Sequence, residues 1–245
     1  MSIDLFPAFV RENYEIHEWK HASAILKADL TSEWNDVISV LTQFRLKSAY
    51  INTAGGNKSA VSYAIDQAFS EYGWREMAFG TTITIQPHER RPKTKVDNRK
   101  GKVVTGGYAA TSYESPTHNV DCFKNGVALE IEWNNKDPFF DRDLNNFRLL
   151  FDLRVASVGI IITRCDELQL IFNKLGRGSS YGMSTTHMSK LLPRIHGGGG
   201  GGCPILVFGI KPNLYIEDEL IDQALEQFML DPKPNDESSQ DEERK

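Results

Sequence analysis

Three acidic residues, Asp121, Glu130 and Glu132, have types and spacing that could build one chemical site. Glu130 and Glu132 are two residues apart in an apolar stretch, so on a β-strand their side chains would share one face. The dipeptide Asn125-Gly126 predicts a tight turn that folds the segment of Asp121 back beside them. The three carboxylates would then converge at one end of a hairpin, and the opposite face would be filled by Val127, Leu129 and Ile131.

Three converging carboxylates repel one another unless a cation lies between them. Hard divalent cations prefer oxygen ligands, and Mg²⁺ is the natural partner of such a group. A bound Mg²⁺ activates water and neutralises charge at a reacting phosphate. The alternative is a solvated strand face on which acids are merely exposed, although Glu is depleted in strands.

The order Asp121, eight residues, Glu130, one residue and a third polar position resembles the motif of the PD-(D/E)XK nucleases. Two further features resemble the BglII and BstYI branch of the type II restriction endonucleases, which is BamHI-like. One is a helix that ends at Gly73-Trp74, and the other is the loop Asn134–Asp137 directly after the acidic strand. Many members of the superfamily carry Lys at the third position, where this chain has Glu132.

This resemblance implies an α/β, restriction-endonuclease-like core with a mixed central sheet flanked by helices. It implies a type II restriction endonuclease that makes Mg²⁺-dependent double-strand cuts in DNA at a short palindrome and leaves 5′-phosphate ends. It also implies a homodimer, a cognate DNA methyltransferase as functional partner, a prokaryotic cytoplasmic location and, for this branch, sites centred on GATC.

The resemblance also implies roles for the acids. Asp121, Glu130 and the backbone carbonyl of Ile131 would bind the metal, while Glu132 would act as a ligand or as a general base. A further upstream acid is expected, and we place it at Glu114. Glu76 is the weaker alternative for this acid. Two other functions stay open, namely a repair or junction nuclease on the same core and a non-catalytic DNA-binding module with structural acids.

Several polar and basic segments have side chains suited to DNA. The segment from Glu89 to Lys102 holds seven bases and two acids, a net charge of 7 − 2 = +5. Such bases mostly contact phosphates, whereas Asn and Lys beyond the acidic strand can pair with bases. The alternatives are a helix cap, a solvated loop and ordinary turn chemistry. The expected DNA contacts are Asn57, Lys58, Ser59, Arg90, Arg91, Lys93, Lys95, Asn134, Asn135, Lys136, Arg177, Thr185, Thr186, His187 and Lys190.

The composition is that of an ordinary globular protein. The chain has 245 residues, 40% hydrophobic and 25% charged, with a net charge of −5. No signal peptide or membrane span is expected, because no long apolar run is present. Three scattered cysteines favour reduced, buried thiols rather than a disulfide framework or a zinc site.

Periodicity predicts the elements that must position the acids. Residues 1–75 are expected to form a helical N-terminal part, and residues 76–230 the catalytic core of a single endonuclease domain. A helix over Phe139–Leu153 and an apolar central strand over Ser157–Thr163 should follow the acidic hairpin. The six glycines Gly197–Gly202 predict a mobile loop. Residues 231–245 are expected to be a disordered acidic tail.

Overall fold

The computed structural model describes residues 3–53, 58–87, 109–220 and 226–227. Within the chain, contacts group residues 1–77 with residues 120–245, and they set residues 78–119 apart as a second compact unit. The expected DNA contacts Asn57, Arg90, Arg91, Lys93 and Lys95 lie outside the described residues, as does the expected acidic tail of residues 231–245.

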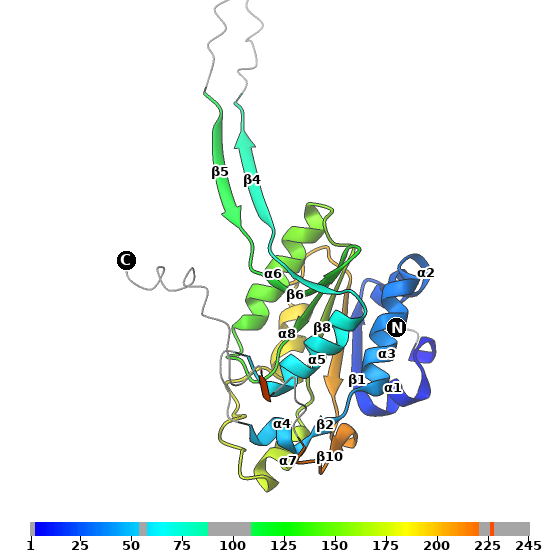
Figure 1. Cartoon of the computed structure of the whole chain (residues 1–245). Helices are drawn as coiled ribbons and strands as arrows, with labels where there is room; N and C mark the ends of the chain where they lie inside the picture. Colours follow the sequence, from blue (N-terminus) through cyan, green and yellow to red (C-terminus); the bar gives the residue numbers. More distant parts are fainter. Residues whose placement is uncertain (1–2, 54–57, 88–108, 221–225, 228–245) are drawn as a thin grey trace, which may run out of the picture. The chain divides into compact units, whose positions relative to one another are not determined.

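The first unit contains a six-stranded sheet in the order β1-β9-β8-β7-β6-β3 (Figure 1). The neighbours β7, β8 and β9 are parallel, whereas β1, β6 and β3 are antiparallel to the strands beside them. This confirms the predicted mixed sheet. The strand bounds are β1 Tyr14–Trp19, β3 Arg75–Met77, β6 Val120–Lys124, β7 Val127–Ile131, β8 Val158–Arg164 and β9 Ile205–Ile210.

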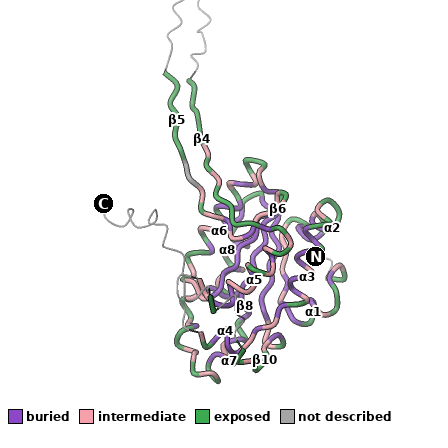
Figure 2. The backbone as a smooth tube through the Cα atoms, viewed as in Figure 1, coloured by how far each residue is buried: buried purple, intermediate pink, exposed green. Residues whose placement is uncertain are grey.

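Strand β8 lies at the centre of the sheet because its sequence is apolar on both faces. All seven of its residues are buried, and it pairs with β7 on one side and β9 on the other. A strand covered on both faces has a continuous run of Val and Ile rather than an alternating pattern. Figure 2 shows the buried core that results.

Helices cover both faces of the sheet. On one face α6 packs Phe147 against Gly159, where a Cβ atom would come within 2.4 Å of the ring, and α8 packs Met188 against Gly209. On the other face α5 lies against β6 and β7. The helix bounds are α1 Ala8–Asn13, α2 Ala22–Asp29, α3 Thr31–Gln43, α4 Ser48–Asn52, α5 Ala60–Glu71, α6 Phe139–Asp152, α7 Leu168–Lys174 and α8 Met188–His196, with short 3-10 turns at Ile3–Leu5 and Pro212–Leu214.

The N-terminal part is not wholly helical, which corrects the sequence-based prediction. Residues Tyr14–Trp19 form β1, which pairs antiparallel with β9 from Tyr14 opposite Ile210 to Trp19 opposite Ile205. Tyr14 and Ile16 are buried at alternate positions, as a strand requires. The alternation is short and lies between segments with helical periodicity, so the local sequence favours a helix. The strand is selected by its partner β9, which is distant in the sequence.

The six glycines Gly197–Gly202 also differ from the prediction of a mobile loop. They form a turn between α8 and β9 that packs closely on neighbouring side chains. A Cβ at position 200 would lie 2.3 Å from Ile205 Cδ1, and one at position 201 would lie 2.5 Å from Arg148 Cγ. Glycine is needed here because the backbone passes so close to other residues, and Gly198 also has a φ of +91°.

The second unit is a two-stranded antiparallel hairpin of β4 Gly80–Ile85 and β5 Thr111–Pro116. Ile83 lies opposite Tyr113 in the register, and both side chains are more than half exposed, at 52% and 57%.

A short strand pair and three free cysteines also belong to the described part of the chain. Strands β2 Leu46–Lys47 and β10 Tyr215–Ile216 form a short parallel pair. Cys122, Cys165 and Cys203 are free and buried, as predicted. Among the residues described, no helix combines the length and apolar character needed to cross a membrane.

Candidate active site

The hairpin of β6 and β7 forms as the sequence predicts. Asn125 and Gly126 have φ angles of 46° and 83°, which a tight hairpin turn requires at both central positions. The register pairs Cys122 with Leu129, so the next residues out, Asp121 and Glu130, lie side by side on the opposite face. That is the face covered by α6.

The carboxylates of Asp121 and Glu130 each accept a hydrogen bond from a backbone N–H group. The N–H of Ile131 donates to Asp121 Oδ2 at 2.9 Å, and the N–H of Asp121 donates to Glu130 Oε2 at 3.3 Å. Glu130 is 1% exposed, and its Oε1 is buried without a hydrogen-bond partner. The backbone therefore fixes both carboxylates in place but leaves one oxygen of Glu130 unsatisfied.

Glu132 lies just beyond the end of β7 and is also buried. Its N–H donates to the carbonyl of Ile162, which extends the pairing with β8 by one residue. Its carboxylate accepts hydrogen bonds from Asn135 Nδ2 at 2.8 Å and from Arg142 Nη2 at 3.3 Å. The buried carboxyl of Asp143 on α6 acts electrostatically on Glu132.

Asp143 and Arg142 are site residues that sequence reasoning missed. Asp143 is fully buried, its Oδ1 accepts from Arg142 Nε at 3.0 Å, and its Oδ2 has no hydrogen-bond partner. A signal was present, because Asp143 occupies the apolar stripe of α6 between Phe140 and Phe147 at helical spacing. An acid at such a position is rarely left without a polar partner.

Crowding of these acids favours their neutral forms. Burial raises the pKa of Asp121 above its usual value, and burial followed by repulsion from Asp143 and Asp121 raises the pKa of Glu130 well above it. Burial and the neighbouring Asp143 likewise raise the pKa of Glu132. Two like charges in one buried space repel each other, so a proton on either Glu132 or Asp143 favours the charged form of the other.

A fifth acid, Asp66 on α5, acts on Asp121. Asp66 accepts a hydrogen bond from Cys122 Sγ at 3.3 Å, and its Oδ2 lies 2.8 Å from Lys58 Nζ. Asp66 and Lys58 both act electrostatically on Asp121. No signal in the sequence pointed to Asp66, because the helix pattern alone does not tell which strand α5 contacts.

Two acids were expected upstream of Asp121, namely Glu114 and, as the weaker alternative, Glu76. Glu76 lies on β3 and is exposed. Glu114 lies on β5 of the second unit, opposite Thr82, and is also exposed. Asp66 is an upstream acid of the first unit that acts electrostatically on Asp121.

The residues present fit a hard divalent cation by their chemistry. All the donors are carboxylates, and Oε1 of Glu130 and Oδ2 of Asp143 are buried oxygens that lack a partner. Such oxygens are costly to bury unless a donor or a cation meets them. Within the part of the chain that the structure describes, no group of three or more Asp, Glu, His or Cys side chains is arranged so that it could hold a metal ion.

The loop after Glu132 is tied to the segment before α8. The N–H of Thr186 donates to the carbonyl of Asn135 at 2.8 Å, and the N–H of Asp137 donates to the carbonyl of Ser184 at 3.0 Å. Lys136 and Thr185 form an isolated antiparallel bridge. Two loops predicted separately as DNA contacts are therefore one paired structure beside the acids.

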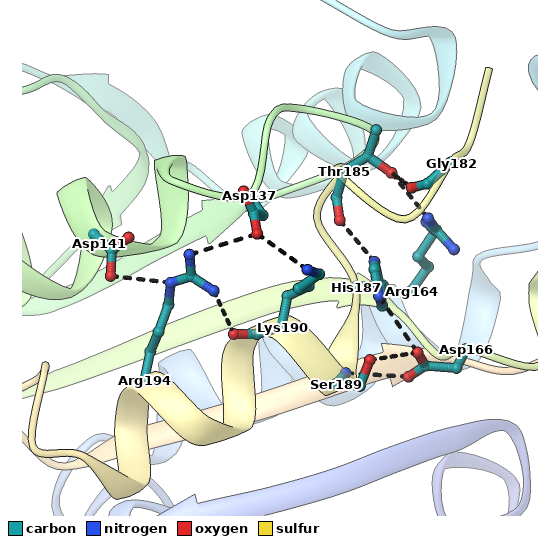
Figure 3. Close-up of polar contacts among 10 residues, drawn as sticks. All are labelled: Asp137, Asp141, Arg164, Asp166, Gly182, Thr185, His187, Ser189, Lys190 and Arg194. Atoms are coloured by element: carbon teal, nitrogen blue, oxygen red, sulfur yellow. Dashed lines mark hydrogen bonds and ion pairs between the residues drawn. The ribbon is translucent and has the colours of Figure 1, made fainter. Parts of the chain in front are cut away.

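Figure 3 shows the polar contacts that hold this paired structure to α8. Asp137 lies 3.5 Å from Lys190 Nζ and 3.6 Å from Arg194 Nη2, and Arg194 also donates to Asp141 on α6 at 3.0 Å. Arg164, at the end of β8, donates to Thr185 Oγ1 at 2.9 Å. These contacts connect β8, α6 and α8 around the two loops.

Several expected DNA contacts are engaged within the protein. Thr186 and His187 are 0% and 2% exposed, and His187 contacts the carbonyl of Thr185 and the carboxylate of Asp166. This burial favours a structural role for both residues. Ser59 caps α5 by accepting from the N–H of Ser62 at 3.0 Å.

The other expected contacts keep some exposure. Lys136 is exposed, whereas Asn134, Asn135, Arg177, Thr185 and Lys190 are half-buried, as is Lys58. Asn134 adopts a left-handed conformation with φ of 62°, which shows that turn chemistry shapes this loop.

A comparison with protein families extends these observations over most of the chain. Residues 14–210 match the family described as "Restriction endonuclease BglII/BglIII". The match begins at the first residue of β1 and ends at the last residue of β9, so it spans all six strands of the central sheet. No curated protein matches the sequence. The chain belongs to the BglII/BglIII family of restriction endonucleases, which are nucleases that act on DNA.

Proposed function

We propose that this chain is a type II restriction endonuclease that hydrolyses both strands of DNA at a short palindrome, depends on Mg²⁺ and leaves 5′-phosphate ends. The observation that carries the proposal is the pairing of Asp121 with Glu130 across the β6–β7 hairpin, with an unsatisfied buried oxygen on Glu130. The family match over residues 14–210 supports DNA as the substrate.

Asp121 and Glu130 are the residues we propose to hold the metal, with the backbone carbonyl of Ile131 as a further ligand. Asp66 is our candidate for the upstream acid, in place of Glu114, because it acts on Asp121 within the same unit. When bound, Mg²⁺ would supply positive charge at the phosphate and lower the pKa of a water molecule.

The side chains around Glu132 support two roles for it. Burial and the neighbouring Asp143 raise the pKa of Glu132, and a carboxylate with a raised pKa can take up the proton that an attacking water loses. Alternatively, Glu132 serves as a metal ligand. In both cases Asn135 and Arg142 hold the carboxylate in a fixed orientation.

A homodimer on two-fold symmetric DNA follows from the same reasoning. The described part of one chain holds one such group of acids, and two strands must be cut, so two copies related by a two-fold axis suit a palindrome. The residues we propose to contact the DNA are Lys58, Asn134, Asn135, Lys136, Arg177, Thr185 and Lys190, together with the basic segment that contains Arg90, Arg91, Lys93 and Lys95.

A restriction-modification role places the protein in the cytoplasm of a prokaryote, beside a DNA methyltransferase that protects the same site. We propose both as consequences of the activity. A culture in which the chain is tolerated only when a matching methyltransferase is expressed would support this part of the proposal.

The test is digestion of a plasmid of known sequence in Mg²⁺ by the wild type and by Glu130→Ala. Discrete fragments from the wild type and intact plasmid from the variant are expected, and sequencing the ends gives the site and the 5′ phosphates. A smear would favour a nonspecific or junction nuclease. No cleavage in Mg²⁺ or Mn²⁺ on several DNAs would overturn the proposal in favour of a binding module.

A further inference from the structure

Arg142 lies at the acidic site, although no sequence motif marks it. It is in the first turn of α6, directly after the loop that follows Glu132. Its guanidinium lies 2.9 Å from Asp143 Oδ1 and 3.3 Å from Glu132 Oε1. Its side chain nevertheless remains 34% exposed, whereas those of Glu132 and Asp143 are 2% and 0% exposed. Arg142 therefore connects the buried acids with solvent.

The charge of Arg142 acts on the whole acidic group. It opposes the rise in pKa at each of the four acids Asp121, Glu130, Glu132 and Asp143. A DNA phosphodiester brings another negative charge to this already acidic place. A fixed cation at the surface of the site would reduce the repulsion that the phosphate meets.

The geometry of the side chain leaves donors for a ligand. Its contacts with the two acids use Nε and Nη2, and a guanidinium has further N–H donors on Nη1. Its carbon Cζ lies 4.3 Å from the centre of the Phe139 ring, which restricts the plane of the group. A planar, oriented and partly exposed guanidinium is the form of Arg best suited to phosphate oxygens.

We propose that Arg142 contacts the phosphate at the scissile bond and stabilises the charge that its oxygens carry during hydrolysis. This inference rests on the proposed function. In the reaction, the oxygen of water forms a bond to phosphorus, and the bond from phosphorus to the 3′ oxygen breaks. One water proton ends on the 3′ oxygen and the other stays on the 5′-phosphate group. Arg142 donates hydrogen bonds and transfers no proton.

The experiment compares the full-length wild type with Arg142→Ala and Arg142→Lys in single-turnover cleavage of an oligonucleotide that carries the mapped site. Removal of one preorganised donor to reaction charge commonly slows the chemical step about 10²–10³-fold, and this is the loss we expect for Arg142→Ala. Arg142→Lys should recover part of the rate because it restores a cation without the planar group. Arg148→Ala, an exposed arginine on the same helix, is the matched control and should cleave at the wild-type rate.

A second measurement separates phosphate contact from a purely structural role. Binding of a duplex with an uncharged methylphosphonate at the scissile position is measured in Ca²⁺ for the wild type and Arg142→Ala. The variant should bind the natural duplex more weakly but the methylphosphonate duplex equally well. An equal loss on both duplexes, or wild-type cleavage by Arg142→Ala, would overturn the inference while the proposed function stands. If the wild type cleaves no DNA, both fail together.

Discussion

Glu130→Gln should stabilise the protein while it abolishes cleavage. In the absence of a divalent cation, Glu130 is a 1% exposed carboxyl whose Oε1 has no partner and whose neighbours Asp121 and Asp143 are also acidic. A glutamine is nearly the same shape, can keep the 3.3 Å hydrogen bond from the N–H of Asp121 and carries no charge. The substitution therefore removes the electrostatic cost and preserves the packing.

The magnitude follows from the unsatisfied group. Burial of a polar group without a partner costs about 1–3 kcal/mol, and more when the group is charged. We therefore expect the free energy of unfolding at pH 8 in EDTA to rise by about 1–3 kcal/mol. For a chain of this size each kcal/mol corresponds to about 2–4 °C in Tm. Thermal unfolding followed by circular dichroism measures this difference directly.

The gain in stability of Glu130→Gln should depend on pH. Burial raises the pKa of Glu130 in the folded state, so between the unfolded and folded pKa values the folded protein binds more protons. The wild type thus loses stability as the pH rises through this window, whereas Glu130→Gln does not. The gain should be largest at pH 8 and small near pH 4.5. Glu12→Gln, an exposed control, should show neither effect. A gain independent of pH, or a loss of stability at pH 8, would refute the reasoning.

Three further predictions concern ligand binding and packing. Mg²⁺ should raise the Tm of the wild type but not of Glu130→Gln, because a ligand at 100 times its Kd adds about 2.7 kcal/mol only where its site exists; equal shifts in both proteins would argue against a site at this residue. Gly159→Ala should lower the free energy of unfolding, measured by chemical denaturation, by about 1–3 kcal/mol, because its Cβ would lie 2.4 Å from the ring of Phe147. The control Gly182→Ala should change this free energy little, because its Cβ would meet its nearest atom at 3.5 Å. Ser59→Ala should cost about 1 kcal/mol by removal of the cap of α5, and Ser59→Thr should restore most of it in the same assay.

Local sequence was sufficient for the central elements of this protein. The hairpin of Asp121 and Glu130 was predictable because the Asn125-Gly126 turn and the two-residue period act over a few residues. The buried strand β8 and the helix α6 were predictable for the same reason, since a continuous apolar run and a helical stripe are local patterns.

The tertiary structure decided what surrounds that hairpin. The face of α5 that meets β6 is decided by packing between segments that are far apart in the sequence. Asp66 and Cys122, which are in contact, are separated by 56 residues. The effect of Asp66 on Asp121 depends on the same packing. The choice of strand for Tyr14–Trp19 depends on β9, nearly the whole chain away. Such partners leave no mark in a local pattern, because either conformation suits the isolated segment.

Some of the site residues were predictable from the sequence, and others depend on the tertiary structure. The sequence by itself determined that Asp121, Glu130 and Glu132 could share one end of a hairpin. Only the packing of α6 on the sheet decided that Asp143 joins them and that Arg142 lies at their solvent-facing side. The physical reason is that charge and burial become coupled only when separate elements enclose one volume, and that volume exists in the folded protein alone.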